Sequence, residues 1–165
     1  MTARGRRPYA GAAGQRKHAA AARACAGRLD SARPGLLSAR GMAPTTPEAV
    51  NELFERHLNA GDLDALAALY EEDAVLLPQP GVGTAGRVAI REALAAFVTA
   101  KARLQCCVTQ VVRTGDLAML FNDWSGTVTD PEGVVQSVAG HAIQVVRRQP
   151  DGTWRFVIDD PYARG

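Results

Sequence analysis

Residues 103–160 decide the fold class, and they read RLQCCVTQVVRTGDLAMLFNDWSGTVTDPEGVVQSVAGHAIQVVRRQPDGTWRFVIDD. The segment holds four stretches rich in β-branched and aromatic residues, separated by the short sequences TGD, DPEG and PDG. Turn residues between apolar stretches are typical of consecutive antiparallel hairpins. The pattern therefore predicts four long antiparallel strands, at residues 103–113, 116–129, 134–148 and 153–160.

The residues before this segment have helical periodicity. Thr45-Thr46-Pro47-Glu48 is a helix start signal, and Ala60-Gly61 is a stop signal. Asp62 is expected to cap a second, short helix, and a third helix is expected from about Arg87 to Lys101. Helices followed by strands predict the α+β class.

Two shorter stretches lie between the second and third predicted helices. Residues 73–78 indicate a brief strand, and the following PQPGVGTAG is expected to be a loop because it is rich in glycine and proline.

Composition separates residues 1–43 from the rest of the 165-residue chain. Residues 1–41 carry nine Lys/Arg and one acid, whereas residues 42–165 carry ten Lys/Arg and sixteen acids, a net charge of −6. The first 43 residues are rich in Ala, Gly and Arg with few large apolar residues, so we expect a disordered tail. One alternative is that Met42 is the true start of the protein. A nucleic-acid arm and a transit peptide are further alternatives that we do not favour.

Several functional classes have no motif support. The chain has no P-loop, no Cys-x-x-Cys and no His-Glu-x-x-His, so we expect neither a metal nor an organic cofactor. No apolar stretch approaches 18 residues, so we expect no membrane partner. The cysteines Cys25, Cys106 and Cys107 do not indicate a disulfide framework, which favours a reducing, cytoplasmic location.

The order of these elements resembles a known family. The stretches that carry the resemblance are NAGDLDALAALYEEDAVLLP (59–78), GRVAIREAL (86–94) and GTWRFVIDDP (152–161). They are similar to SnoaL-like and ketosteroid-isomerase-like proteins of the nuclear-transport-factor-like superfamily, over about residues 47–162. The resemblance implies a cone-shaped α+β barrel at residues 44–165, in which a curved antiparallel sheet wraps around helices and encloses an apolar pocket. Members include isomerases, cyclases, dehydratases, epoxide hydrolases and proteins without a known reaction, so the fold does not set the reaction.

If the cone is correct, chemistry must come from polar side chains on its apolar inner faces. His57 follows the helical stripe of Leu53 and Phe54, so it is expected to look into the cone with Phe54 as a ligand contact. Tyr70 resembles the aromatic residue near the family's pocket floor and could donate a hydrogen bond to a carbonyl. The alternatives are a structural histidine at position 57 and a packing aromatic at position 70.

Strand alternation supplies further candidates. Asn122 and Trp124 share a face that we expect to point inward, as a polar contact and a pocket wall. His141 shares a face with Ile143, and Gln144 falls opposite. Whether His141 binds ligand or lies on the outer face is left open.

The last predicted strand ends in two aspartates. Trp154, Phe156 and Ile158 form an apolar face that Asp160 continues, whereas Asp159 falls on the other face unless a bulge near Pro161 shifts the register. An inward Asp160 would have its pKa raised by desolvation and could act as a general base. Its alternative role is to cap the following turn.

Two functions remain open at this stage. The first is an isomerase- or lyase-like enzyme that acts on a small apolar carbonyl compound, with Asp160 or a histidine as base. The second is a non-catalytic module that binds a small ligand or dimerises. An outer sheet face without helices also predicts a homodimer packed sheet to sheet. The residues expected on that face are Val108, Val112, Val138 and Val146.

Overall fold

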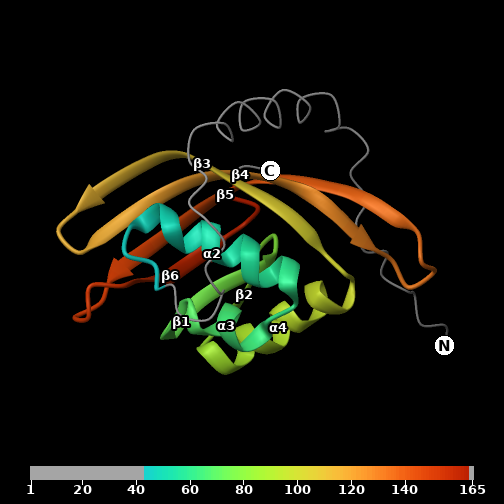
Figure 1. The fold of residues 1–165 in the computed structure, drawn as a ribbon, viewed down its shortest axis with the longest axis horizontal. Coiled ribbons are helices and arrows are strands. Elements are labelled where there is room, and N and C mark those ends of the chain that lie inside the picture. Colours follow the sequence, from blue (N-terminus) through green and yellow to red (C-terminus); the bar gives the residue numbers. More distant parts are fainter. Residues whose placement is uncertain (1–42, 164–165) are drawn as a thin grey trace, which may run out of the picture. The chain divides into compact units, whose positions relative to one another are not determined.

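The computed structural model of the chain describes residues 43–163, which contain three helices and six strands (Figure 1). The predicted tail, except Ala43, lies outside these residues. The bounds are α2 Pro47–Ala60, α3 Leu63–Ala68, β1 Tyr70–Gln79, β2 Val82–Ala85, α4 Arg87–Thr99, β3 Arg103–Thr114, β4 Leu117–Thr129, β5 Val135–Arg148 and β6 Trp154–Asp160. The predicted α+β class is confirmed, and the four long strands begin and end within one residue of the predicted positions.

The helices form for the local reasons that the sequence indicates. Thr46 caps α2, because its Oγ1 accepts a hydrogen bond from Ala49 N at 3.2 Å. Gly61 ends α2 in the left-handed conformation, with φ of 74°. Asp62 Oδ1 then accepts from Ala65 N at 3.0 Å and caps α3. The chain therefore reverses between two helices and delivers Tyr70 to the start of β1.

The sheet is curved and open, with strand order β2-β1-β6-β5-β4-β3. Figure 1 shows the long strands arching over α2, with α3 and α4 on the same concave side. Two details differ from the expectation of an antiparallel barrel: β1 pairs with β6 in parallel, and the strands do not close. The predicted loop after residue 78 also contains β2, which forms a hairpin with β1.

The β4–β5 ladder is regular, whereas β3 and β6 each contain a bulge. Thirteen consecutive pairs, from Leu117↔Arg147 to Thr129↔Val135, join β4 and β5 without interruption. In β3 the register shifts around Thr109. In β6 it shifts around Val157, because Val145 pairs with Ile158 and the next residue, Val146, pairs with Phe156. An unpaired extra residue reverses the alternation of every side chain after it.

Helix α2 protects the open edge of β3. Asn59 donates to Leu104 O and accepts from Leu104 N, both at 2.8 Å, so its side chain substitutes for a neighbouring strand. Glu55 Oε2 accepts from Cys106 N at 2.8 Å one turn earlier. Unpaired edge strands invite aggregation, and these contacts satisfy part of the edge.

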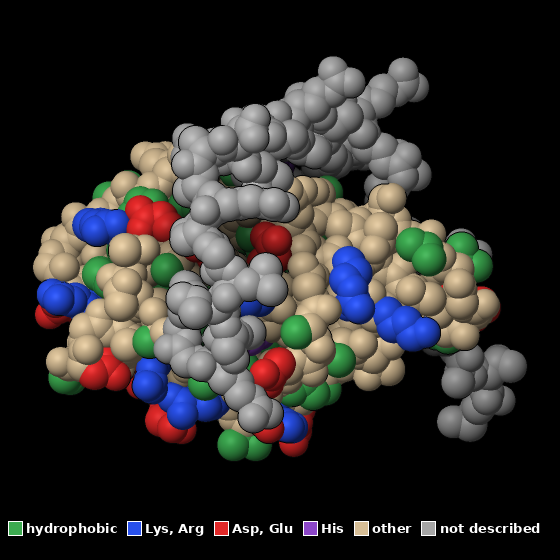
Figure 2. All heavy atoms as spheres, viewed as in Figure 1, with side chains coloured by type: hydrophobic (Ala, Val, Ile, Leu, Met, Phe, Trp, Pro, Cys, Tyr) green, Lys and Arg blue, Asp and Glu red, His purple; other side chains and the backbone are tan. Residues whose placement is uncertain are grey.

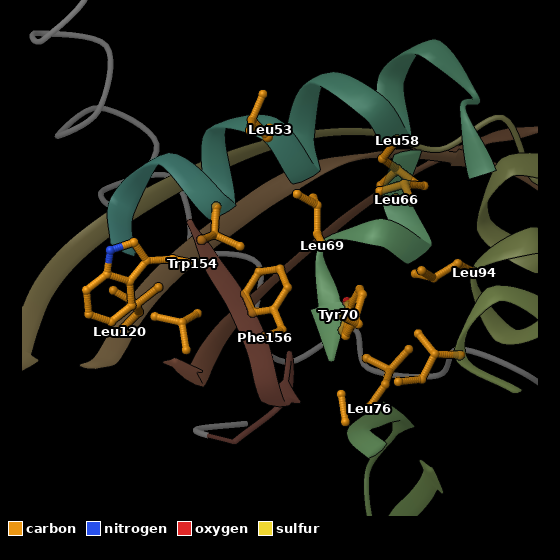
Figure 3. Close-up of a cluster of buried hydrophobic side chains, with 14 of the residues drawn as sticks. Leu53, Leu58, Leu66, Leu69, Tyr70, Leu76, Leu94, Leu120, Trp154 and Phe156 are labelled. Atoms are coloured by element: carbon orange, nitrogen blue, oxygen red, sulfur yellow. The ribbon is translucent and has the colours of Figure 1, made fainter. Parts of the chain in front are cut away.

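The core lies between the concave face and the helices. Figure 3 shows Tyr70 and Phe156 next to each other in the core. Their ring centroids are 4.9 Å apart, and Phe54 from α2 meets Phe156 edge to face at 6.1 Å. Both Tyr70 and Phe156 are fully buried, so the core holds the end of β6 firmly against β1 and α2.

Two negative findings concern residues 43–163. None of the described helices has the length and apolar character needed to cross a membrane. The sequence GVGTAG at residues 81–86 has the spacing G-x-G-x-x-G, but here it forms the β1–β2 hairpin and the start of α4 rather than a phosphate-binding turn.

The visible surface carries charges of both signs. Figure 2 shows Lys and Arg side chains interspersed with Asp and Glu over the left and lower parts of this face. A mixed surface on a body with an acidic net charge gives no electrostatic support for phosphate-backbone binding. That nucleic acid is not a partner stays a prediction.

Candidate functional site

Asp159, not Asp160, points into the domain. Phe156 is fully buried, Ile158 is 42% exposed and Asp159 is 3% exposed, so the inward face passes from Phe156 to Asp159. The bulge at Val157 causes this change, and it lies four residues earlier than the position near Pro161 that the sequence suggested. The alternation that predicted an inward Asp160 is therefore wrong. Asp160 is half-buried, and its Oδ1 accepts from Tyr162 N at 3.1 Å, which is the turn-capping role.

Tyr70 holds one oxygen of the Asp159 carboxyl group. The Tyr70 hydroxyl donates to Asp159 Oδ2 at 2.6 Å. Burial raises the pKa of Tyr70 well above its usual value, and the Asp159 charge raises it further, so the phenol keeps its proton. Burial also raises the pKa of Asp159, opposed by the hydrogen bonds from Tyr70 and Gln144, while neighbouring Asp160 raises it further.

Gln144 and Asn51 complete a buried chain that the sequence analysis did not assign to the site. Gln144 Nε2 donates to Asp159 Oδ1 at 3.0 Å, and Asn51 Nδ2 donates to Gln144 Oε1 at 2.8 Å. Gln144 pairs with Asp159 across the β5–β6 ladder, so their side chains are neighbours on the concave face. One signal was available: Asn51, Glu55 and Asn59 follow one another at intervals of four residues, so they form a polar stripe on α2.

Asn122 lies on the same concave face, as predicted, and is 2% exposed. It forms a hydrogen bond with the thiol of Cys106 in β3, which lowers the thiol pKa. Burial and the Glu55 carboxylate outweigh this effect and raise the pKa of Cys106 to about 12, so Cys106 is not a thiolate nucleophile at neutral pH. The Oδ1 atoms of Asn122 and Asn51 are both buried without a hydrogen-bond partner among the described residues.

Cys107 points to the opposite face of β3 and is disulfide-bonded. The sequence did not indicate a disulfide framework, so this bond was not expected. The cytoplasmic location therefore stays a prediction without structural support.

Trp124 covers the inner face of the regular ladder. It pairs with Gly140, and a Cβ atom at Gly140 would lie only 2.6–2.9 Å from atoms of the indole ring. The indole Nε1 donates to Pro161 O at 2.8 Å, and the ring meets Tyr162 edge to face at 5.6 Å. Trp124 therefore fixes the segment that directly follows the two aspartates.

The two histidines within residues 43–163 lie apart from this cluster. His57 is half-buried near the end of α2, where burial lowers its pKa against the opposing effect of Asp62. No hydrogen bond joins it to the Asp159 cluster in the described structure. His141 lies on the outer face, where its Nδ1 is 2.7 Å from Asp123 Oδ1. Of the two placements left open for His141, the outer one is therefore observed.

The cluster can hold and move a proton, but it offers no evident metal site. Asp159 accepts two hydrogen bonds in a buried position, a geometry suited to general acid/base chemistry. Within residues 43–163 no group of three His, Cys, Asp or Glu side chains could hold a metal ion.

Comparisons with known proteins agree with this fold. The sequence model of the SnoaL-like domain matches residues 50–157. No curated protein matches the chain.

Solved structures share the fold at low sequence identity. A ketosteroid isomerase-like protein from Erwinia carotovora atroseptica is 23% identical, with a TM-score of 0.62 over 68% of this chain and 89% of that one. A candidate scytalone dehydratase from Novosphingobium aromaticivorans is 20% identical, with a TM-score of 0.62 over 68% and 78%. A candidate calcium/calmodulin-dependent protein kinase II association domain from Xanthomonas campestris is 20% identical, with a TM-score of 0.59 over 80% and 100%.

Proposed function

The chain belongs to the SnoaL-like domain family, and on this premise we propose that it is a cofactor-independent isomerase or lyase. The reaction is general acid/base chemistry on a small, largely apolar carbonyl compound that binds next to Asp159, at the end of β6. The observation that carries the proposal is the buried Asp159 carboxylate held by Tyr70 and Gln144. The structural neighbours are named as isomerase-like and dehydratase proteins, which supports the same class of chemistry.

Asp159 takes the role of general base that simple strand alternation predicted for Asp160. Burial raises its pKa toward the pH at which a base both is ionised and accepts a proton readily. Tyr70 keeps its own proton and orients the carboxylate through the bond to Oδ2. The proposed step moves a proton from the carbon next to the substrate carbonyl to Asp159, and the electron pair of the broken C–H bond passes toward the carbonyl oxygen.

Three of the remaining candidates are placed around this base in the proposal, whereas His57 lies apart from it. Asn122 would bind the substrate oxygen: its free Oδ1 suits a hydroxyl group, and rotation of the amide would offer NH₂ to a carbonyl. Phe54 and Trp124 would form apolar walls, and half-buried His57 is the second candidate base. We do not carry Asp160 or His141 into the site, because they face the turn and the outer surface.

The test uses 3-cyclohexenone, a small ketone that becomes conjugated when a proton is removed next to its carbonyl and returned at the far carbon of the alkene. Conjugation is followed by ultraviolet absorbance. We expect the wild-type protein to accelerate the conversion and Asp159→Asn to lose about 100-fold or more, the usual contribution of a general base. Asp160→Asn is the matched control and should keep most of the activity. Equal losses in the two variants, or no acceleration by the wild type, would contradict the proposal.

Self-association is the second candidate function, and the outer face of the sheet favours it. Val112, Met119 and Ile158 lie in one row across that face and are 51%, 40% and 42% exposed. Of the four residues predicted there, Val112 alone is correctly placed. Val146 is fully buried and Val108 packs against the core, because the bulge at Thr109 separates the faces of Val108 and Val112. Val138 alternates with His141 and so lies on the inner face.

We propose that this row forms a homodimer interface, since exposed apolar patches mark such sites. The structural similarity to a candidate association domain points the same way. Sedimentation at micromolar concentration should give a dimer for the wild type and a monomer for Met119→Asp. A monomeric wild-type protein would argue against the interface.

A further inference from the structure

Asn51, Gln144 and Asp159 form a hydrogen-bonded chain whose direction depends on charge. An ionised carboxylate can only accept hydrogen bonds, so Gln144 must present its NH₂ group to Asp159. The carbonyl oxygen of Gln144 then faces Asn51, which must also present NH₂. The arrangement of the two amides matches the ionised form, and it leaves Asn51 Oδ1 buried without a partner among the described residues.

A proton on Asp159 would find only one place in this chain. The fully buried Tyr70 hydroxyl has no other hydrogen bond in the described structure, so it continues to donate to Oδ2. The added proton must therefore sit on Oδ1, which faces the NH₂ group of Gln144 at 3.0 Å. Two donors cannot share that contact, and the side-chain amide of Gln144 has to turn over.

Reversal of Gln144 propagates to Asn51. Asp159 would then donate to Gln144 Oε1, and the turned Gln144 Nε2 would face Asn51 in place of the present oxygen. Asn51 must turn as well, and its unpartnered Oδ1 gains a donor. The reversed chain keeps the same number of hydrogen bonds, so protonation does not leave the carboxyl group unpaired.

We propose that Asn51 and Gln144 are positioning residues of a proton-coupled amide chain, in which proton uptake by Asp159 reverses both amides. The free end of Asn51 would change from an acceptor to a donor in the same step. The functional meaning rests on the proposed role of Asp159 as base. The chain itself is tested without substrate, so failure of the isomerisation assay and failure of this inference are distinguishable.

The other ionisable groups around Asp159 come from each neighbouring element. Tyr70 approaches from β1 and Asp160 follows in β6, and the Asp159 charge raises the pKa of Cys106 in β3. Glu55 on α2 faces Cys106. Tyr70 and Cys106 both have raised pKa values, so they stay protonated while Asp159 titrates.

The first experiment is an NMR titration of the full-length wild-type chain. The carboxyl ¹³C signal of Asp159 and the side-chain NH₂ signals of Gln144 and Asn51 are followed against pH. We expect all three to shift with one common midpoint, and the two amide shifts to disappear in Asp159→Asn. Amide signals of Asn51 that do not follow Asp159 would overturn the inference, whatever Gln144 does.

The second experiment removes the end of the chain with Asn51→Leu, which nearly preserves shape. Asn51 bonds to Gln144 in both directions of the chain, but this bond is stronger in the ionised form, because the Asp159 charge polarises the whole chain. Its loss should therefore destabilise the ionised form more and raise the proton affinity of Asp159 by about threefold. Asn122→Leu is the matched control: it removes another buried amide that bonds to Cys106 and should leave the midpoint of Asp159 nearly unchanged. Equal shifts of the Asp159 midpoint in both variants would indicate a general effect of packing and overturn the inference. If Asn51→Leu does not fold, the wild-type titration decides alone.

Discussion

The β4–β5 ladder and strand β6 are neighbours in one sheet, yet only the ladder follows simple alternation throughout. In the ladder, Asn122 lies inward and His141 outward, as regular alternation of side chains between the two faces of a strand predicts. In β6 the bulge at Val157 turns Ile158 outward and Asp159 inward. A single unpaired residue therefore decides which of two adjacent aspartates meets the core.

Deletion variants should show the largest difference between the regular ladder and β6. Deleting Val145 from the regular ladder would turn Val146 outward and the charged Arg147 inward, so we expect no cooperative unfolding transition. Deleting Val157 removes only the extra residue of the bulge, so Phe156 and Asp159 keep their inward faces and the protein should still fold. Thermal unfolding followed by near-ultraviolet circular dichroism distinguishes the two. A folded Val145 deletion together with an unfolded Val157 deletion would contradict the assigned register.

Two substitutions in β6 test the faces directly. Phe156→Ala should lower the free energy of unfolding by about 3–5 kcal/mol, because it removes a fully buried ring. Ile158→Ala should cost about 1 kcal/mol or less, since the side chain is on the exposed face. Urea unfolding of both variants measures the difference. Similar costs would mean that both residues face the core, as uninterrupted alternation requires.

A glycine substitution tests the packing of the regular β4–β5 ladder. Gly140→Ala places a methyl group against the Trp124 ring, which must shift. We expect a loss of about 1–3 kcal/mol in the free energy of unfolding, the usual effect of overpacking. Trp124 fluorescence should change as the ring moves away from Pro161 O. An unchanged stability and spectrum would show that the ring does not lie over Gly140.

The pH dependence of stability should show the smallest effect. The pKa of Asp159 is raised on folding, so its contribution is fully favourable below the unfolded value of about 3.9 and is lost as pH rises toward the folded value. Asp159→Asn should remove this loss. Its melting temperature relative to the wild type should therefore increase as pH rises from about 4. A relative decrease over that range would mean that folding stabilises the ionised carboxylate.

The fold was predictable because its signals are local. Turn sequences separate the four long strands, and Thr46, Gly61 and Asp62 set helix ends through their own backbone and side-chain geometry. β2 was missed because its few residues lie in a stretch whose glycines indicate a loop.

The site was only partly predictable. Tyr70 and Asn122 could be named as polar residues on apolar faces, but the partner of Tyr70 depends on a bulge that the local sequence does not reveal. The prediction that Gln144 and His141 lie on opposite faces of their strand is correct. Gln144 lies on the inner face, where the site is. Asn51 was not predicted, because the apolar residues of α2 were used to find the inward face of the helix. Asn51 belongs to the polar stripe beside them.

The assignment of the buried, inward carboxyl group to Asp159 underlies the whole site. Its most direct test is the carboxyl ¹³C titration of Asp159 in the wild type and in Tyr70→Phe. We expect a pKa above the usual aspartate value in the wild type, because burial outweighs the two hydrogen bonds, and a further rise when the Tyr70 donor is removed. A pKa at or below the usual value that Tyr70→Phe leaves unchanged would contradict the account.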